Sequence, residues 1–114
     1  MTSEPKMNLH DALAIAIKSI RKSRNLTQED FGLVSSRTYL STLERGLKSP
    51  TLDKLDEIAG VMDVHPASLV LLAYVIRASD DCLKLSDVDL VCQESKHLLS
   101  LLPGVTASSN RRAR

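Results

Sequence analysis

Four polar side chains are spaced so that one side of a short helix would carry them all. An α-helix brings residues three and four positions apart onto the same face. The arginine of this set can donate two hydrogen bonds to O6 and N7 of guanine, and the hydroxyl groups can reach base edges or the methyl group of thymine. Such a face suits the reading of a DNA duplex. These residues are Arg37, Thr38, Ser41 and Thr42.

The segment that must position these side chains has the pattern of two short helices joined by a tight turn. Thr27 and Asp30 match a capping box, in which each side chain pairs with the other residue's backbone, and this box predicts a helix over about 28–33. The serines that follow favour a turn and a new N-cap. A second helix is therefore expected over about 37–45, with Gly46 as the left-handed residue that ends it.

Several spaced motifs in and around this segment match, in order, the pattern of one protein family. The matching motifs are Leu26-Thr27-Gln28-Glu29, Tyr39-Leu40-Ser41, Leu43-Glu44-Arg45-Gly46, Ser49-Pro50-Thr51-Leu52, and Leu55 with Ala59. Over about residues 9–72 the chain resembles the Cro/CI (XRE-like) helix-turn-helix family of DNA-binding regulators. This resemblance implies an all-α fold, with a compact five-helix domain over residues 8–77 whose helix 37–45 enters the major groove.

The resemblance also implies roles outside the base-reading face. Gln28 stands at the family's phosphate-clamping position, at the amino end of its helix. Arg21 stands where the family has an arginine that pairs with the glutamate before the Arg-Gly ending, here Glu44, and this ion pair ties the first helix to the recognition helix. Tyr39 either packs on the helix 28–33 or hydrogen-bonds a phosphate. The expected phosphate-binding residues are Gln28, Ser36, Tyr39, Arg45 and Lys48.

One departure from the family pattern concerns the spacing between the two short helices. Between Gln28 and Glu44 the chain is about two residues shorter than the usual pattern, and Gly32 stands where a small residue normally packs the helix pair. Either the first of the two helices is cut short or the turn is tightened.

Composition and charge distribution favour one helical domain with a DNA-facing end. The chain has 114 residues, 43% of them hydrophobic and only 3% aromatic, which suits one modest core of packed helices. Lys and Arg outnumber Asp and Glu by seven to three over residues 18–48, whereas the acids lead by nine to four over 49–102. A duplex attracts the first part and repels the second. Without an 18-residue apolar run or a signal peptide, no membrane contact and a cytoplasmic location are expected.

The sequence lacks the residue patterns of common enzymes and metal sites. It contains no GxSxG, glycine-rich phosphate loop or HExxH, and no histidine lies near Ser35 or Ser36 to activate a nucleophile. Cys82 and Cys92 lie far from any CxxC or Cys/His spacing, and His65 is expected beside a helix N-terminus rather than on a metal. The sequence therefore predicts no enzyme, cofactor, metal or small-molecule ligand.

Local capping signals predict the ends of two further helices. Asn8 with Asp11 is expected to open the first helix of the domain. Thr51 is expected to open a helix after the recognition helix, and either Gly60 or Asp63 is expected to end it.

The C-terminal half adds apolar helices that one small core cannot cover. The helix expected over 66–77 is apolar around most of its circumference, and 86–102 form an amphipathic helix within the segment 78–104. This last helix is expected to form a dimer interface with the preceding one, or else to act as a strut on its own chain. Residues 1–7 and the basic segment 105–114 are expected to be disordered. The expected interface residues are Leu71, Tyr74, Val75, Val88, Val91, Leu98, Leu99 and Leu102.

Two functions are compatible with these expectations. The leading hypothesis is a homodimeric transcriptional repressor that binds an inverted repeat in double-stranded DNA. The alternative is a protein-interaction module, such as an antitoxin or a restriction-modification controller, that binds a protein partner through its C-terminal helices and regulates its own operon.

Overall fold

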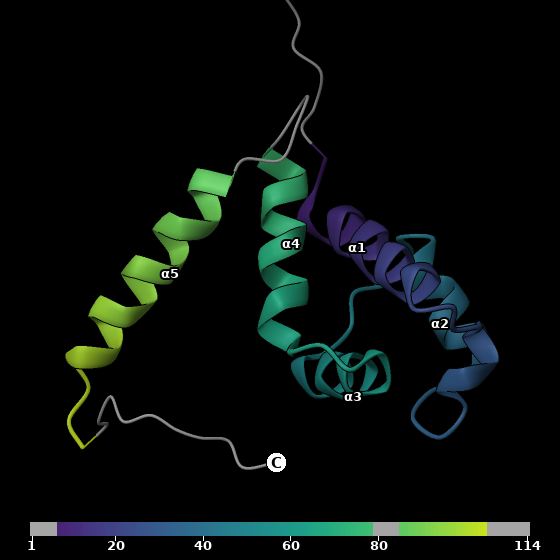
Figure 1. Cartoon of the computed structure of the whole chain (residues 1–114). Coiled ribbons are helices and arrows are strands. Elements are labelled where there is room, and N and C mark those ends of the chain that lie inside the picture. The colour runs from purple at the N-terminus through teal and green to yellow at the C-terminus, as the bar shows by residue number, and fades with distance from the viewer. Residues whose placement is uncertain (1–6, 79–84, 105–114) are drawn as a thin grey trace, which may run out of the picture. The chain divides into compact units, whose positions relative to one another are not determined.

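The computed structural model describes residues 7–78 and 85–104 (Figure 1). Within these residues the chain forms five α-helices and one short 3₁₀ helix, which confirms the predicted all-α fold. The expectations for residues 1–6, 79–84 and 105–114, which include the disordered ends and Cys82, lie outside the described residues. The elements are α1 (Leu9–Ser23), η1 (Gln28–Phe31), α2 (Arg37–Glu44), α3 (Leu52–Met62), α4 (Pro66–Ala78) and α5 (Leu85–Ser100).

The chain divides into two compact units, residues 1–83 and 84–114. In the first unit α1 packs against α4 and α2, and α3 packs against α4 and η1. Each of these helices turns apolar side chains toward one shared core, and burial of one such side chain contributes about 1.5–3 kcal/mol. The core therefore fixes the inner face of α2, from which Leu40 and Leu43 enter it. Its largest fully buried side chains are Phe31, Ile17, Leu40, Leu43, Ile58, Met62 and Leu69.

Side-chain caps open the helices at the predicted residues. Asn8 Oδ1 accepts from the backbone N–H of Asp11 at 3.0 Å, and this contact opens α1. Ser36 and Thr51 cap α2 and α3 in the same way, each accepting from the amide three residues later at 3.0 and 3.1 Å. His65 Nδ1 accepts from the amide of Ala67 at 3.0 Å at the start of α4. These caps supply partners for amides that a helix leaves unpaired at its first turn.

The helix expected over about 28–33 is shorter than predicted and has a different geometry. Only residues Gln28–Phe31 are helical, as the 3₁₀ helix η1, and the remainder forms turns. Asp30 Oδ2 accepts from the Thr27 amide at 2.7 Å, so the reaching-back half of the capping box is present. Because the N-cap of α2 already lies at Ser36, a helix that continued to residue 33 would leave only residues 34 and 35 for the turn between the two helices. The shorter spacing of this chain is therefore accommodated by a shorter first helix.

Three helices in the first unit end at a residue in the left-handed conformation. Asn25, Gly46 and Asp63 have φ of 60°, 76° and 60°. In each case the residue after it donates its amide to a carbonyl five positions back, as in Leu47 to Thr42 at 3.1 Å, which is a Schellman motif. Of the two residues expected to end α3, Asp63 does so, and Gly60 lies inside the helix.

Replacement of Gly46 and of Gly60 by alanine is expected to change stability in opposite directions. At Gly46 an added Cβ would lie 2.6 Å from Asp11 Oδ1, and the alanine would have to keep a positive φ. Gly46→Ala should therefore lower the free energy of unfolding by about 1–2 kcal/mol. At Gly60 an added Cβ meets no atom within 4 Å, so Gly60→Ala should stabilise by about 0.5–1 kcal/mol through reduced chain entropy. Urea unfolding with an unchanged m-value measures both effects. A loss of stability in Gly60→Ala would contradict this account.

No single helix among the described residues is long and apolar enough to cross a membrane. The pair α3 and α4 reaches the length and composition of a span only when taken together, and the two helices are bent by 101° relative to each other. Both helices contribute fully buried side chains to the core of the first unit.

Candidate nucleic-acid interface

The outer face of α2 carries the four residues predicted to read bases. Because Leu40 and Leu43 are buried on the inner side, Arg37 and Thr38 are exposed on the outer side, and Ser41 and Thr42 are half-buried. Thr42 Oγ1 donates to the carbonyl of Thr38 at 2.7 Å. The hydroxyl proton of Thr42 is therefore used inside the helix, and this side chain offers a methyl group and an acceptor to a ligand.

Arg37, at the first position of α2, pairs with an acidic residue of η1. Its Nη1 lies 3.3 Å from Glu29 Oε2, and the two side chains are 71% and 73% exposed. Pairs this exposed contribute little to stability, because water and salt screen them. In the structure the contact directs the Arg37 side chain toward η1 and leaves it exposed to solvent.

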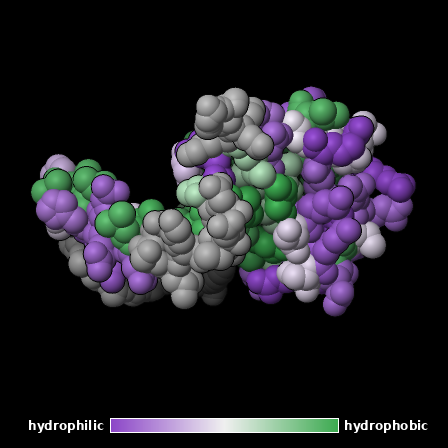
Figure 2. Space-filling view, turned by 90° about the horizontal axis from the view of Figure 1, so that it is seen from above, coloured by the Kyte–Doolittle hydropathy of each residue, from purple (hydrophilic) through white to green (hydrophobic). Residues whose placement is uncertain are grey.

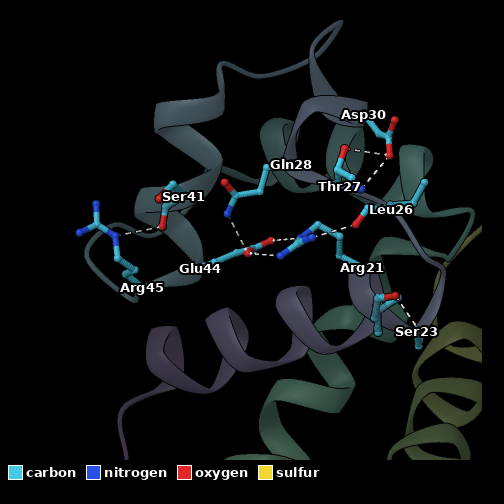
Figure 3. Close-up of polar contacts among 10 residues, drawn as sticks. Arg21, Ser23, Leu26, Thr27, Gln28, Asp30, Ser41, Glu44 and Arg45 are labelled. Atoms are coloured by element: carbon cyan, nitrogen blue, oxygen red, sulfur yellow. Dashed lines mark hydrogen bonds and ion pairs between the residues drawn. The ribbon is translucent and has the colours of Figure 1, made fainter.

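A polar network beneath α2 joins α1, η1 and α2 (Figure 3). Arg21 of α1 donates from Nε to Glu44 Oε2 at 2.6 Å, from Nη2 to Glu44 Oε1 at 2.9 Å, and from Nη1 to the Leu26 carbonyl at 2.8 Å. Gln28 Nε2 donates to the same Glu44 Oε1 at 3.1 Å. The Arg21 and Glu44 side chains are only 10% and 2% exposed, and the hydrogen bonds that Arg21 donates to Glu44 raise the pKa of Arg21.

This network occupies the polar groups of two predicted site residues, Arg21 and Gln28. The predicted partners Arg21 and Glu44 form a two-bonded ion pair across 23 positions of sequence. All three guanidinium nitrogens of Arg21 are engaged, so this side chain supports α2 from behind. The amide of Gln28, predicted to hold a phosphate, is turned inward to Glu44, as Figure 3 shows.

The other predicted phosphate-binding residues lie around the two ends of α2. Ser36 caps its amino end, and Arg45 follows its carboxyl end, where Arg45 Nε lies 3.4 Å from the Ser41 carbonyl. Lys48 is exposed, with its Nζ 5.3 Å from the centre of the half-buried Tyr39 ring. The Tyr39 side chain packs against the core.

Lys54 of α3 is a residue of this region that sequence reasoning missed. Its Nζ lies 5.7 Å from the centre of the Tyr39 ring, donates to the Val34 carbonyl in the turn before α2, and pairs with Glu57 Oε1 at 3.1 Å. A lysine two positions inside a helix has no sequence signal that separates it from any solvated cation. Its contact with the turn depends on the packing of α3 against η1.

The residues predicted to form a dimer interface differ in exposure. On α4, Tyr74 is 45% exposed, with Arg77 stacked 5.2 Å from the centre of its ring, whereas Val75 is only 5% exposed and therefore offers almost no surface to a partner. Leu71 and Val88 are half-buried. On α5 green apolar side chains lie at the surface among purple hydrophilic ones (Figure 2). The exposed predicted residues are Val91, Leu98 and Leu99 of α5, and Leu102 in the turn that follows it.

Among the residues that the structure describes, no group of three or more His, Cys, Asp or Glu side chains could hold a metal ion. Cys92 is exposed on α5 with a free thiol.

Comparison with known proteins gives matches to DNA-binding regulators. Residues 17–69 match the family described as Helix-turn-helix. The chain is 38% identical over 56 residues to the immunity repressor protein of Bacillus phage phi105, which covers 47% of this chain and 39% of that protein. It is 35% identical over 66 residues to the uncharacterized HTH-type transcriptional regulator y4dJ of Sinorhizobium fredii, which covers 56% of this chain and 86% of that protein. The chain thus matches about two fifths of the phage repressor's length and most of the second relative.

Among solved structures, the chain is similar to the clp gene regulator ClgR from Corynebacterium glutamicum. One crystal structure of that protein matches with a TM-score of 0.61 and 27% identity, over 67% of this chain and 100% of that chain. A second crystal structure of it matches with a TM-score of 0.58 and 24% identity, over 82% of this chain and 92% of that chain, and at this identity the likeness concerns the fold alone.

Proposed function

The chain belongs to the Cro/CI (XRE-like) helix-turn-helix family of DNA-binding transcriptional regulators, and on that premise we propose that it acts as a homodimeric repressor. Each protomer places the outer face of α2 in the major groove of an operator half-site. The observation that carries this proposal is the composition of that face, where Arg37 and Thr38 are exposed and Ser41 and Thr42 are half-buried. An arginine there can bond guanine O6 and N7, and short hydroxyl side chains can approach other base edges.

The support behind this face favours base reading over general attraction to DNA. Specific readout needs side chains that are held in one orientation against the duplex. Here α2 is held from below by two core leucines and by the carboxylate of Glu44, which receives bonds from Arg21 and Gln28. Exposed Lys48 and Arg45 at the carboxyl end of α2, together with the Ser36 cap at its amino end, supply the phosphate contacts that set the register.

A dimer follows from how little DNA one such helix reads. One recognition helix contacts only a few base pairs, so a unique operator needs two half-sites and two protomers. The apolar side chains exposed on α5 give the surface through which two chains associate. Two-fold symmetry then makes the operator an inverted repeat with half-site centres roughly 10 base pairs, or about 34 Å, apart.

The test of base reading is the selection of bound sites from a random DNA pool, followed by measurement of variants. Arg37→Ala should cost roughly 1–3 kcal/mol on the best site and relax the preference at one base pair of each half-site. Lys48→Ala should weaken all sequences about equally, because a phosphate contact carries no sequence information. If the selected consensus of Arg37→Ala equalled that of the unaltered protein, the recognition face would be assigned incorrectly.

A further inference from the structure

An acidic side chain lies directly beside the arginine proposed to read a base. Glu29 of η1 and Arg37 of α2 both line an open cleft of about 430 Å³, whose other lining residues are Arg21, Leu26, Thr27 and Gln28. A carboxylate at a surface that meets DNA repels every phosphate, whatever the base sequence. The position of Glu29 therefore lowers the affinity for any DNA duplex, so an advantage of this residue would have to lie in sequence selectivity.

The geometry of the contact indicates that reason. Glu29 Oε2 accepts from Nη1 of Arg37 at 3.3 Å, on the side of the guanidinium that faces η1. A guanidinium has five N–H donors in a fixed planar fork, so one occupied Nη1 proton leaves the Nη2 and Nε edge for a bidentate contact. Guanine O6 and N7 accept such a pair. The carboxylate can thus hold the arginine while the arginine binds a base.

We propose that Glu29 is a positioning residue for base recognition, which orients Arg37 toward a guanine and away from the phosphates. This inference rests on the proposed function of Arg37. Its effect is to raise the ratio of operator affinity to non-specific affinity. The cause is orientation, because the ion pair limits the rotamers of a long exposed side chain before binding. The repulsion between the carboxylate and the phosphates weakens operator binding and non-specific binding alike and leaves their ratio unchanged.

Glu29→Gln removes the charge and nearly preserves the shape. Dissociation constants for the selected operator and for a scrambled duplex, measured by fluorescence anisotropy at one salt concentration, give the ratio. We expect tighter binding to the scrambled duplex and a three- to fivefold fall in the ratio, since an exposed pair carries at most about a fivefold effect. In the Arg37→Ala background, Glu29→Gln should leave the ratio unchanged within error, because the carboxylate then has no arginine to orient.

Two controls separate orientation from general charge and from stability. Asp56→Asn changes the net charge equally at an exposed position of α3 and should leave the ratio unchanged. The urea midpoint of Glu29→Gln should equal that of the unaltered protein, because the pair is exposed.

An unchanged ratio in Glu29→Gln would overturn this inference, and so would an equal fall in the Arg37→Ala background. Arg37→Ala alone tests the proposed function separately. If Arg37→Ala relaxes the consensus while Glu29→Gln shows no coupling to it, only the role of Glu29 is lost. If Arg37→Ala leaves the consensus intact, the base-reading face itself is wrong.

Discussion

Replacement of either Arg21 or Glu44 by alanine is expected to lower the free energy of unfolding by about 3 kcal/mol, because each substitution leaves the other charge buried without its partner. The Glu44 side chain is 2% exposed and accepts from Nε and Nη2 of Arg21 and from Nε2 of Gln28, so its loss also leaves these three donors unsatisfied. Urea unfolding of the two single variants measures this effect. The same substitution at exposed Arg24, beside the carboxyl end of α1, is the matched control and should cost much less.

The double variant tests whether the two residues act as a pair. If they do, Arg21→Ala with Glu44→Ala should destabilise by less than the sum of the single effects, since the double variant leaves no unpaired charge. Arg21→Lys should recover only part of the loss, because an ammonium group cannot reproduce the bidentate contact to Oε1 and Oε2. Additive single effects would show that Arg21 and Glu44 are independent.

Removal of residues 84–114, the unit that contains α5, is expected to weaken operator binding on the order of 100-fold. The reason is loss of avidity, because two half-sites joined by a dimer hold both recognition helices at high effective concentration. The core of α1–α4 is built from the first unit and should keep its urea midpoint. Sedimentation equilibrium gives the dimer dissociation constant, and anisotropy on the full operator and on one half-site gives the affinities.

Two exposed leucines on α5 allow a substitution on the proposed dimer face to be compared with one away from that face. Leu98 lies on the same helical stripe as Val91, whereas Leu90 lies about a quarter of a turn away from both, and both leucines are exposed. Leu98→Glu should raise the dimer dissociation constant more than Leu90→Glu does. A full-length protein that sediments as a 12.5 kDa monomer and still binds an inverted repeat tightly would contradict the dimer, and would favour a different protein partner for α5.

Local signals in the sequence predicted much of the fold. The caps at Asn8, Ser36 and Thr51 each join a side chain to an amide three residues later, so a short window of sequence contains the whole interaction. Gly46 was predicted to end the recognition helix for a similarly local reason. By contrast, the pairing of Arg21 with Glu44 spans 23 positions and was inferred only from the family resemblance.

Side-chain contacts between different helices could not be predicted from the sequence. The turn of Gln28 toward Glu44 spans 16 positions, and the contact of Arg37 with Glu29 spans 8. Both depend on how η1 packs against α2, and the prediction placed a longer α-helix there. Val75 was expected at an interface because α4 is apolar almost all round, a composition in which periodicity cannot identify the buried side.

The contact between Lys54 and the Val34 carbonyl has a consequence for the genetics of this protein. It makes the turn before the recognition helix depend on a side chain of α3, which lies outside that helix in sequence. On the proposed function as a repressor, alleles at Lys54 in a screen for derepressed mutants would therefore have the phenotype of alleles on α2 and not that of folding alleles in the core. A map of such alleles would outline the support of the recognition helix as well as its DNA-facing surface.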